Sequence, residues 1–366
     1  MSGVIAVHVG AGYHGSSLRT AYKDACKKAC IAAIEKLKTG MNAVEAVAEA
    51  VCVLENCPLT NAGIGSNLTF NGVVECDAGI MDGKNLNFGS VGALKNIKNP
   101  VKVAQKILEE QACGLLPGGR IPPCTLVGSG ATDWALEKGF KFFDNQFLST
   151  KASETAFSKN LSLVQNTLST VQENSNPMLE NGIDDNDLFD TVGAVCVDCF
   201  GNVASAVSSG GLLLKYSGRI GQAAVFGSGC WAEQSIEDEK PSIAICVTGI
   251  GEYLIKTMFA RECHHTLYND PYSVSAVPDF FKNKFINNSC LKNVDLKLAG
   301  VLILKCFSQE DFCELSWAHN TKTMILGYMS TDSKKPVTIF SSQPESATIG
   351  ESVMFAEKCI KLKHTS

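Results

Sequence analysis

The sequence has no uninterrupted apolar run of the roughly 18 residues that a membrane-spanning helix needs. Its first residues, MSGVIAVHVGAGYHG, contain no Lys or Arg, and their apolar run is too short for a signal peptide. A basic excess is also missing, because 32 Lys and Arg stand against 37 Asp and Glu, which gives a net charge of −5. We therefore expect a protein without a membrane span and without a basic nucleic-acid-binding surface.

Cysteine is present, but without the spacing of a disulfide framework or a zinc site. Most of the 16 cysteines stand within apolar patterns, and only Cys196 and Cys199 form a CxxC motif. On a strand those two side chains would point to opposite faces. We expect free thiols in a reducing, intracellular compartment, with disulfides or a metal site as the alternative.

The first part of the chain predicts alternating strands and helices. Residues 19–38 carry apolar side chains at helical spacing, and Gly40 follows where a C-cap belongs. Asn42 with Glu45 three residues later is typical of a capping pair. The predicted elements are a strand over residues 4–9 and helices over 19–38, 43–54 and from Pro100, with Asn99 as its cap, to a stop at Gly114.

Residues 141–190 differ in character. Ser, Asn, Thr, Asp and Glu dominate, and ENGIDDNDLFD concentrates acidic residues, so we expect a long mobile tract with one helix near Ala156 to Val171. Order returns at TVGAVCVD and NVASAVSS, two β-runs separated by CFGN that indicate a hairpin. Antiparallel central sheets flanked by helices are therefore expected.

The junction NDLFDTVGAV passes directly from the acidic tract to an apolar strand that begins at Thr191. A Thr hydroxyl needs a base to become a nucleophile, and the α-amine of the same residue supplies one only when the preceding peptide bond is cut. Such an amine titrates near 7.7–8.0, so part of it is uncharged at neutral pH. Cleavage between Asp190 and Thr191 would create this base. The alternative is that Thr191 merely begins a strand, where Thr is common.

Several blocks bear on that choice: HVGAGYH, TNAGIGSNL, ECDAGIMDGK, DTVGAV, GNVASAVSSGG, SGRIGQAA, GCWAE and VTGIGE. In this order they resemble the asparaginase-type N-terminal nucleophile (Ntn) hydrolases, and within that family they are similar to the threonine aspartase (taspase) branch. The resemblance implies a four-layer αββα sandwich. It also implies self-cleavage into residues 1–190 (ordered over 1–140, mobile and acidic over 141–190) and residues 191–366. The two parts would form one composite domain, two such pairs would associate, and no metal or organic cofactor would be needed.

The resemblance also implies roles for individual residues. Thr191 matches the nucleophile, and Asp190 the residue after which the precursor cuts itself. Ser209 matches a hydroxyl that touches the nucleophile, although it can also satisfy a strand neighbour. Thr248 and Gly249 match the pair that binds the oxyanion. Asn67 matches a further oxyanion donor, with a plain turn residue as the alternative.

Arg219, Gln222 and Gly251 match the substrate-binding positions. In family members that hydrolyse β-aspartyl amides, the resemblance implies an Asp at position 222, which pairs with the substrate ammonium, and a neutral Gln cannot do this. We therefore predict a threonine endopeptidase that cleaves protein substrates after an internal Asp, with Arg219 holding the Asp carboxylate.

Two other functions stay open. One is an isoaspartyl peptidase or L-asparaginase of the same fold, and the other is an uncut, inactive precursor that binds partners through its acidic tract. The resemblance implies transcription regulators as substrates, without direct nucleic-acid binding. Localisation to the nucleus or cytoplasm is left open, because the tract before Thr191 offers only isolated lysines (Lys151, Lys159) and no import cluster.

Overall fold

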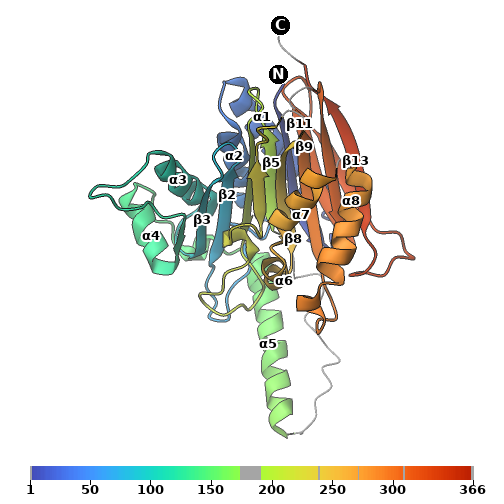
Figure 1. Ribbon diagram of the computed structural model, residues 1–366. Coiled ribbons are helices and arrows are strands. Elements are labelled where there is room, and N and C mark those ends of the chain that lie inside the picture. Colours follow the sequence, from blue (N-terminus) through green and yellow to red (C-terminus); the bar gives the residue numbers. More distant parts are fainter. Residues whose placement is uncertain (1, 174–190, 238–239, 271, 308–309, 364–366) are drawn as a thin grey trace.

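The computed structural model describes residues 2–173, 191–237, 240–270, 272–307 and 310–363. Two β-sheets lie face to face between two layers of helices (Figure 1). The predicted αββα sandwich of the Ntn-hydrolase type is therefore confirmed. Within these residues, no helix combines the length and apolar character needed to cross a membrane.

The larger sheet has eight strands in the order β12-β11-β1-β5-β6-β2-β3-β4. Its outer face is covered by α1, α2 and α3, and the apolar side chains of this layer form one buried cluster with the sheet. The bounds are β1 Val4–Gly12, β2 Cys76–Asp82, β3 Asn87–Leu94, β4 Thr125–Val127, β5 Val192–Val197, β6 Val203–Ser209, β11 Thr323–Ser330 and β12 Val337–Ser342, with α1 Arg19–Lys38, α2 Ala43–Glu55, α3 Pro100–Ala112 and α4 Gly128–Glu137.

The smaller sheet has five strands in the order β13-β10-β9-β8-β7. The helices α7 and α8 cover its outer face, where three phenylalanines of α8 and the following turn surround Phe259 edge-on. The bounds are β7 Cys230–Glu233, β8 Ser242–Gly249, β9 Ala299–Cys306, β10 Phe312–His319 and β13 Met354–Lys361, with α6 Gly251–Lys256, α7 Phe259–Asn269 and α8 Ser273–Phe280. The short helical turns are η1 Asn145–Phe147, η3 Gln222–Ala224, η4 Phe281–Ile286 and η5 Ser289–Leu291.

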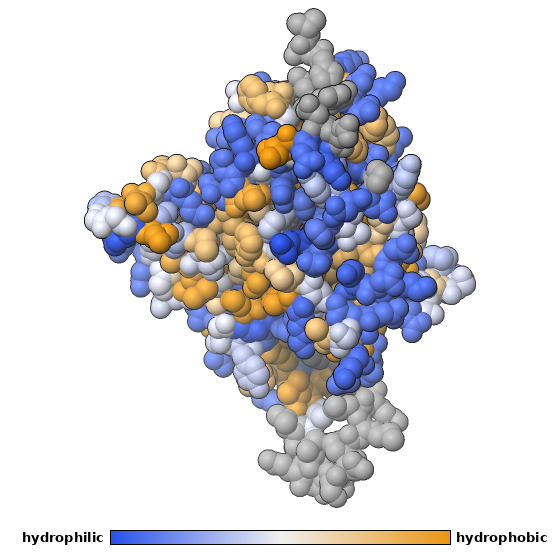
Figure 2. All heavy atoms as spheres, viewed as in Figure 1, coloured by the Kyte–Doolittle hydropathy of each residue, from blue (hydrophilic) through white to orange (hydrophobic). Residues whose placement is uncertain are grey.

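Burial on both faces explains why the central strands are apolar along their whole length. In β5, Val192 and Ala194 pack towards the helices, whereas Val195 and Val197 pack towards the smaller sheet. Figure 2 shows the surface that results, with hydrophilic side chains predominating over α8 and apolar ones gathered in the middle of this face.

The predicted helices of the first part of the chain are confirmed, but one cap is not as expected. Asn42 and Glu45 form the complete capping box of α2. Asn99 precedes α3, but its side chain caps nothing and instead donates to Glu55 Oε2 at 3.1 Å. The N–H of Val101 is accepted by Glu55 Oε1 at 2.9 Å. The cap of α3 therefore comes from the end of α2, a contact across the fold that local sequence does not reveal.

Two further expectations concern the middle of the chain. The hairpin is confirmed, since β5 and β6 pair antiparallel with Val197 opposite Val203. The helix expected near Ala156 to Val171 is confirmed and is longer than expected, because α5 runs from Lys151 to Glu173, while the mobility expected for residues 141–190 stays a prediction. Figure 1 shows α5 projecting from the end of the sandwich at which α6 lies. Asp190 lies outside the described residues, so the division at 190/191 stays a prediction.

The buried Glu55 gives stability a pH dependence. Burial raises the pKa of its carboxyl from 4.5 to about 7, although hydrogen bonds from Val101 and Asn99 oppose the rise. Because the folded protein binds this proton more tightly than the unfolded chain, the resulting stability is present below pH 4.5 and is lost as the pH rises to about 7. The amount is on the order of 3 kcal/mol.

We predict that Glu55→Gln removes this dependence. The Tm of the native protein relative to the variant should fall as the pH rises from about 4.5 to 7, which thermal denaturation at a series of pH values measures. Glu49→Gln, on the same helix at a partly exposed position, is the control. A Tm difference between native protein and Glu55→Gln that stays constant over this range would contradict the prediction.

Candidate active site

Contacts between the sheets bring the predicted catalytic residues to one end of the sandwich. Ser205 Oγ of β6 donates to the carbonyl of Ile245 in β8 at 2.6 Å. Gly193 of β5 lies over Cys246, and a Cβ on Gly193 would come within 2.9 Å of the sulfur. From these contacts, Thr191 lies just before the start of β5, Ser209 is the last residue of β6, and Thr248 lies near the end of β8. All three are therefore at the same end of the sandwich. α6 begins at this same end (Figure 1).

The Thr191 hydroxyl is buried and held by two side chains. Gln222 Nε2 donates to Thr191 Oγ1 at 2.9 Å, and Thr191 Oγ1 donates to Ser209 Oγ at 3.2 Å. Ser209 Oγ in turn accepts from the N–H of Gly211 at 3.0 Å. Thr191 and Ser209 are both only 4% exposed. The predicted nucleophile is therefore a hydroxyl of fixed orientation rather than a solvated strand residue.

Thr248 stands at the end of β8 with an unused hydroxyl. Its side chain is fully buried, and no residue that the structure describes accepts from or donates to its Oγ1. An unpaired buried hydroxyl costs free energy, so it suits a group that appears there only during reaction. Gly249 follows with φ +139°, and a Cβ there would collide with the carbonyl of Leu298. Both residues fit the predicted oxyanion site, and their roles stay predictions.

Asn67 is placed beside the site but is already engaged. Its Nδ2 donates to the carbonyl of Gly211 at 2.9 Å, and its backbone N–H donates to Asn61 Oδ1 at 2.9 Å. The amide thus secures the loop after β6, and the second hydrogen on Nδ2 is the one that an oxyanion could use.

Arg219, Gln222 and Gly251 lie together, as the resemblance implied. A Cβ on Gly251 would lie 2.7 Å from Gln222 Oε1 and 2.8 Å from Arg219 Nη2. Arg219 donates twice to Glu252, from Nε at 2.8 Å and from Nη2 at 2.7 Å. The Nε2 of Gln222 donates to the hydroxyl of Thr191, the predicted nucleophile, and its Oε1 is the end that lies beside Gly251. Sequence alone did not identify Glu252 as part of this group.

Two other residues near the site were missed. Asp77 is fully buried and accepts from the N–H of Gly221 at 2.7 Å and of Ala93 at 2.8 Å, which fixes the turn between Arg219 and Gln222. Burial raises the pKa of Asp77, and the charge of Lys215 opposes this. The quoted block ECDAG contains it, but a lone Asp on a strand gave no signal of a long-range contact.

His8 is the second missed residue. It is fully buried opposite Gly193, and its Nδ1 accepts from the N–H of Gly10 at 3.3 Å. Burial, together with the nearby His14, lowers the pKa of His8 to about 3, while the backbone of Thr191 acts in the opposite direction. The ring is therefore neutral at physiological pH, with its proton on Nε2.

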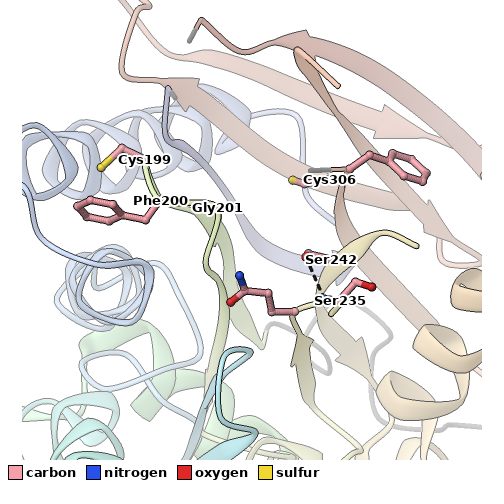
Figure 3. A pocket seen from close by; sticks show the side chains of 8 residues that line it. Cys199, Phe200, Gly201, Ser235, Ser242 and Cys306 are labelled. Carbon is pink, nitrogen blue, oxygen red and sulfur yellow. Dashed lines mark hydrogen bonds between the residues drawn. The ribbon is translucent and has the colours of Figure 1, made fainter. Parts of the chain in front are cut away.

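A separate pocket lies at the other end of the β5–β6 hairpin (Figure 3). It has a volume of about 260 Å³ and is lined by residues of the hairpin turn, of the segment that follows β7, and of β8 and β9, among them Cys199, Gln234 and Cys306. The six residues of β5 separate it from Thr191, a distance of about 20 Å. Among the described residues, no group of three or more His, Cys, Asp or Glu is placed to hold a metal ion.

The sequence is similar to one family model and to several known proteins. A family model described as asparaginase matches residues 1–339. The isoaspartyl peptidase/L-asparaginase of Xenopus laevis is 40% identical over 266 residues, which is 72% of this chain and 76% of that protein. The isoaspartyl peptidase/L-asparaginase of Mus musculus is 35% identical, covering 70% of each chain, and the isoaspartyl peptidase of Salmonella typhimurium is 34% identical, covering 71% and 77%.

The unused hydroxyl of Thr248 gives a sharp prediction. Thr248→Val should leave Tm unchanged or raise it slightly, because the hydroxyl makes no internal hydrogen bond that the structure describes. The hydrolytic rate should fall roughly 10²–10³-fold if the hydroxyl binds the oxyanion. Thermal denaturation and a turnover assay measure the two effects.

Ser205→Ala is the matched control for this variant. Its hydroxyl is also buried between the sheets, but it donates to Ile245, so its loss should cost about 1 kcal/mol of stability and leave the rate intact. A Thr248→Val protein that is destabilised like the control and retains its rate would contradict the oxyanion role.

Proposed function

The chain belongs to the asparaginase family of N-terminal nucleophile hydrolases, and we propose that it hydrolyses β-aspartyl amide bonds, in isoaspartyl peptides and in L-asparagine. The single observation that carries the proposal is the Thr191 hydroxyl held between Gln222 and Ser209 at the end of the two sheets. The names of the relatives supply the substrate class.

This proposal corrects the prediction of an endopeptidase that cleaves proteins after Asp. That prediction is wrong, because the curated relatives are isoaspartyl peptidases and L-asparaginases, which was the stated alternative. The assignment to the taspase branch is corrected with it. The physical reason is that a neutral Gln222 was taken to exclude a substrate ammonium, although the Oε1 of an amide can accept a hydrogen bond from an ammonium group while Nε2 donates to Thr191 Oγ1.

In the proposed reaction the free amine of Thr191 takes the proton from Oγ1, and Oγ1 bonds to the β-carbonyl carbon. The negative charge that forms on the carbonyl oxygen is stabilised by the Thr248 hydroxyl and the Gly249 N–H. The C–N bond then breaks, and the leaving amine or ammonia takes the proton. Water attacks the resulting ester, which releases L-aspartate and restores the hydroxyl. Arg219 would hold the α-carboxylate of the substrate.

The same hydroxyl is proposed to free its own amine. Thr191 Oγ1 attacks the carbonyl carbon of Asp190, the peptide C–N bond breaks to give an ester, and water hydrolyses that ester. The products are a carboxylate on Asp190 and an amine on Thr191. Association of two cleaved pairs remains a proposal by family resemblance.

We predict that the processed protein releases L-aspartate from a β-aspartyl dipeptide and from L-asparagine. Chromatography of the products and an ammonia assay measure the two reactions. The α-aspartyl dipeptide of the same composition is the control, and it should remain uncleaved. Cleavage of the control without release of L-aspartate from the β-linked peptide would refute the proposal.

A second prediction concerns maturation. The native protein should yield two fragments on a denaturing gel, and the smaller should begin Thr-Val-Gly-Ala-Val. Thr191→Val should remain a single chain of 39.1 kDa, because the attacking hydroxyl is gone. Ser205→Ala, which alters another buried hydroxyl, should mature normally. Cleavage of Thr191→Val at the same bond would show that this hydroxyl does not perform the cut.

A further inference from the structure

Toward the residues that the structure describes, Arg219 uses one of its two hydrogen-bonding edges. Its side-on edge, formed by Nε and Nη2, donates to both carboxylate oxygens of Glu252 at 2.8 and 2.7 Å. This bidentate pairing fixes the plane of the guanidinium group. The end-on edge, formed by Nη1 and the second hydrogen of Nη2, remains for a further anion.

Three glycines surround that end-on edge, and we call them the glycine cradle: Gly211, Gly221 and Gly251. A Cβ would lie 2.9 Å from Arg219 Nη1 at Gly211 and at Gly221, and 2.8 Å from Nη2 at Gly251. At each position a side chain would therefore press on the guanidinium group.

The backbone requires a glycine at only one of the three positions. Gly211 has φ +72°, a left-handed value that favours glycine in any case. Gly221 has φ −95°, and Gly251 is the first residue of α6, so other residues could adopt both conformations. At Gly221 the guanidinium group, rather than the backbone, explains the absence of a side chain, and at Gly251 the guanidinium group does so together with Gln222 Oε1, which would lie 2.7 Å from a Cβ.

We propose that Glu252 is a positioning residue, which holds the side-on edge of Arg219 so that the end-on edge is presented across the glycine cradle to the α-carboxylate of the substrate. The inference rests on the proposed function for the identity of that carboxylate. It assigns to Glu252 a role in substrate binding that does not involve the reacting bond.

The electrostatics support a permanent ion pair. Glu252 lies partly exposed in the first turn of α6, whereas the Arg219 side chain is only 15% exposed. Burial acts to raise the pKa of Glu252, but the hydrogen bonds and charge of Arg219 outweigh it, and the pKa is lowered. The carboxylate is therefore ionised at neutral pH and can hold the arginine before substrate arrives. A flexible arginine would instead lose rotamer freedom on binding.

The test compares two glutamates in matched settings. Glu252→Gln loses the charge and one acceptor, so we expect a roughly tenfold rise in KM for a β-aspartyl dipeptide with little change in kcat. Glu262→Gln is the control, because Glu262 also stands in the first turn of a helix and pairs with an arginine, Arg261, at 3.4 Å. Its KM should stay within twofold of the native value.

Gly221→Ala is a second variant that approaches the same group from the other side. The new methyl group would meet the end of the Arg219 side chain and not backbone, so Tm should change little while KM rises. An unchanged or lowered KM in Glu252→Gln overturns the inference, since a lowered value would mean that Glu252 competes with the substrate. A fall in kcat with KM unchanged also overturns it.

Direct binding separates this inference from the proposed function. If the native protein hydrolyses neither the β-aspartyl dipeptide nor L-asparagine, the proposed function fails. Calorimetric titration with L-aspartate still measures carboxylate binding at Arg219 in that case. Roughly tenfold weaker binding to Glu252→Gln than to Glu262→Gln supports the role of Glu252. Equal binding, or no binding of L-aspartate to the native protein, overturns it.

Discussion

The hydrogen bonds that hold the Thr191 hydroxyl are the constraint on which the rest of the site depends. Gln222 Nε2 donates to Oγ1, so the proton of Oγ1 is directed to Ser209. These two bonds join the start of β5, the end of β6 and the turn η3. The strands β5 and β6 are neighbours in the larger sheet, and their hairpin places Val192 opposite Ser208, next to Thr191 and Ser209. The hairpin register and the turn that carries Gln222 thus give a single hydroxyl its orientation.

Buried or partly buried carboxylates then fasten the surrounding segments. Asp77 holds the backbone at Gly221, Glu55 caps α3, and Glu252 holds Arg219. Each carboxylate loses solvation on burial, and N–H donors of the protein compensate part of that cost. For Glu55 the compensation is incomplete, which is why its pKa is raised to about 7. For Glu252 the charge of the arginine outweighs burial. For Asp77 burial outweighs the opposing charge of Lys215, and its pKa is raised. The sign of each shift follows from whether burial or the donors and charges around the carboxylate have the larger effect.

Much of this fold could be predicted from the sequence because its signals are local. Helical spacing gave the bounds of α1, and Asn42 with Glu45 gave the cap of α2. The contacts that define the site are not local. Gln222 is 31 residues from Thr191, and Arg219 is 33 residues from Glu252. The sequence motifs contained all four residues, but a motif does not state which side chains touch. The cap of α3 was mispredicted for the same reason, since Glu55 lies 46 residues from Val101.

The difference between a residue's identity and its contacts also explains why the prediction of an endopeptidase was wrong. The charge at position 222 was treated as if it faced the substrate alone, and a neutral Gln was taken to exclude an ammonium group. In the structure Nε2 of Gln222 donates to Thr191 Oγ1, which leaves Oε1 as a separate acceptor, while Glu252 pairs with Arg219. Under the proposed function, the charge that a substrate meets is set by the arginine and its partner together, and by the orientation that the glycine cradle permits. The identity of residue 222 alone then does not determine the substrate, because its contacts and those of its neighbours decide which atoms face it.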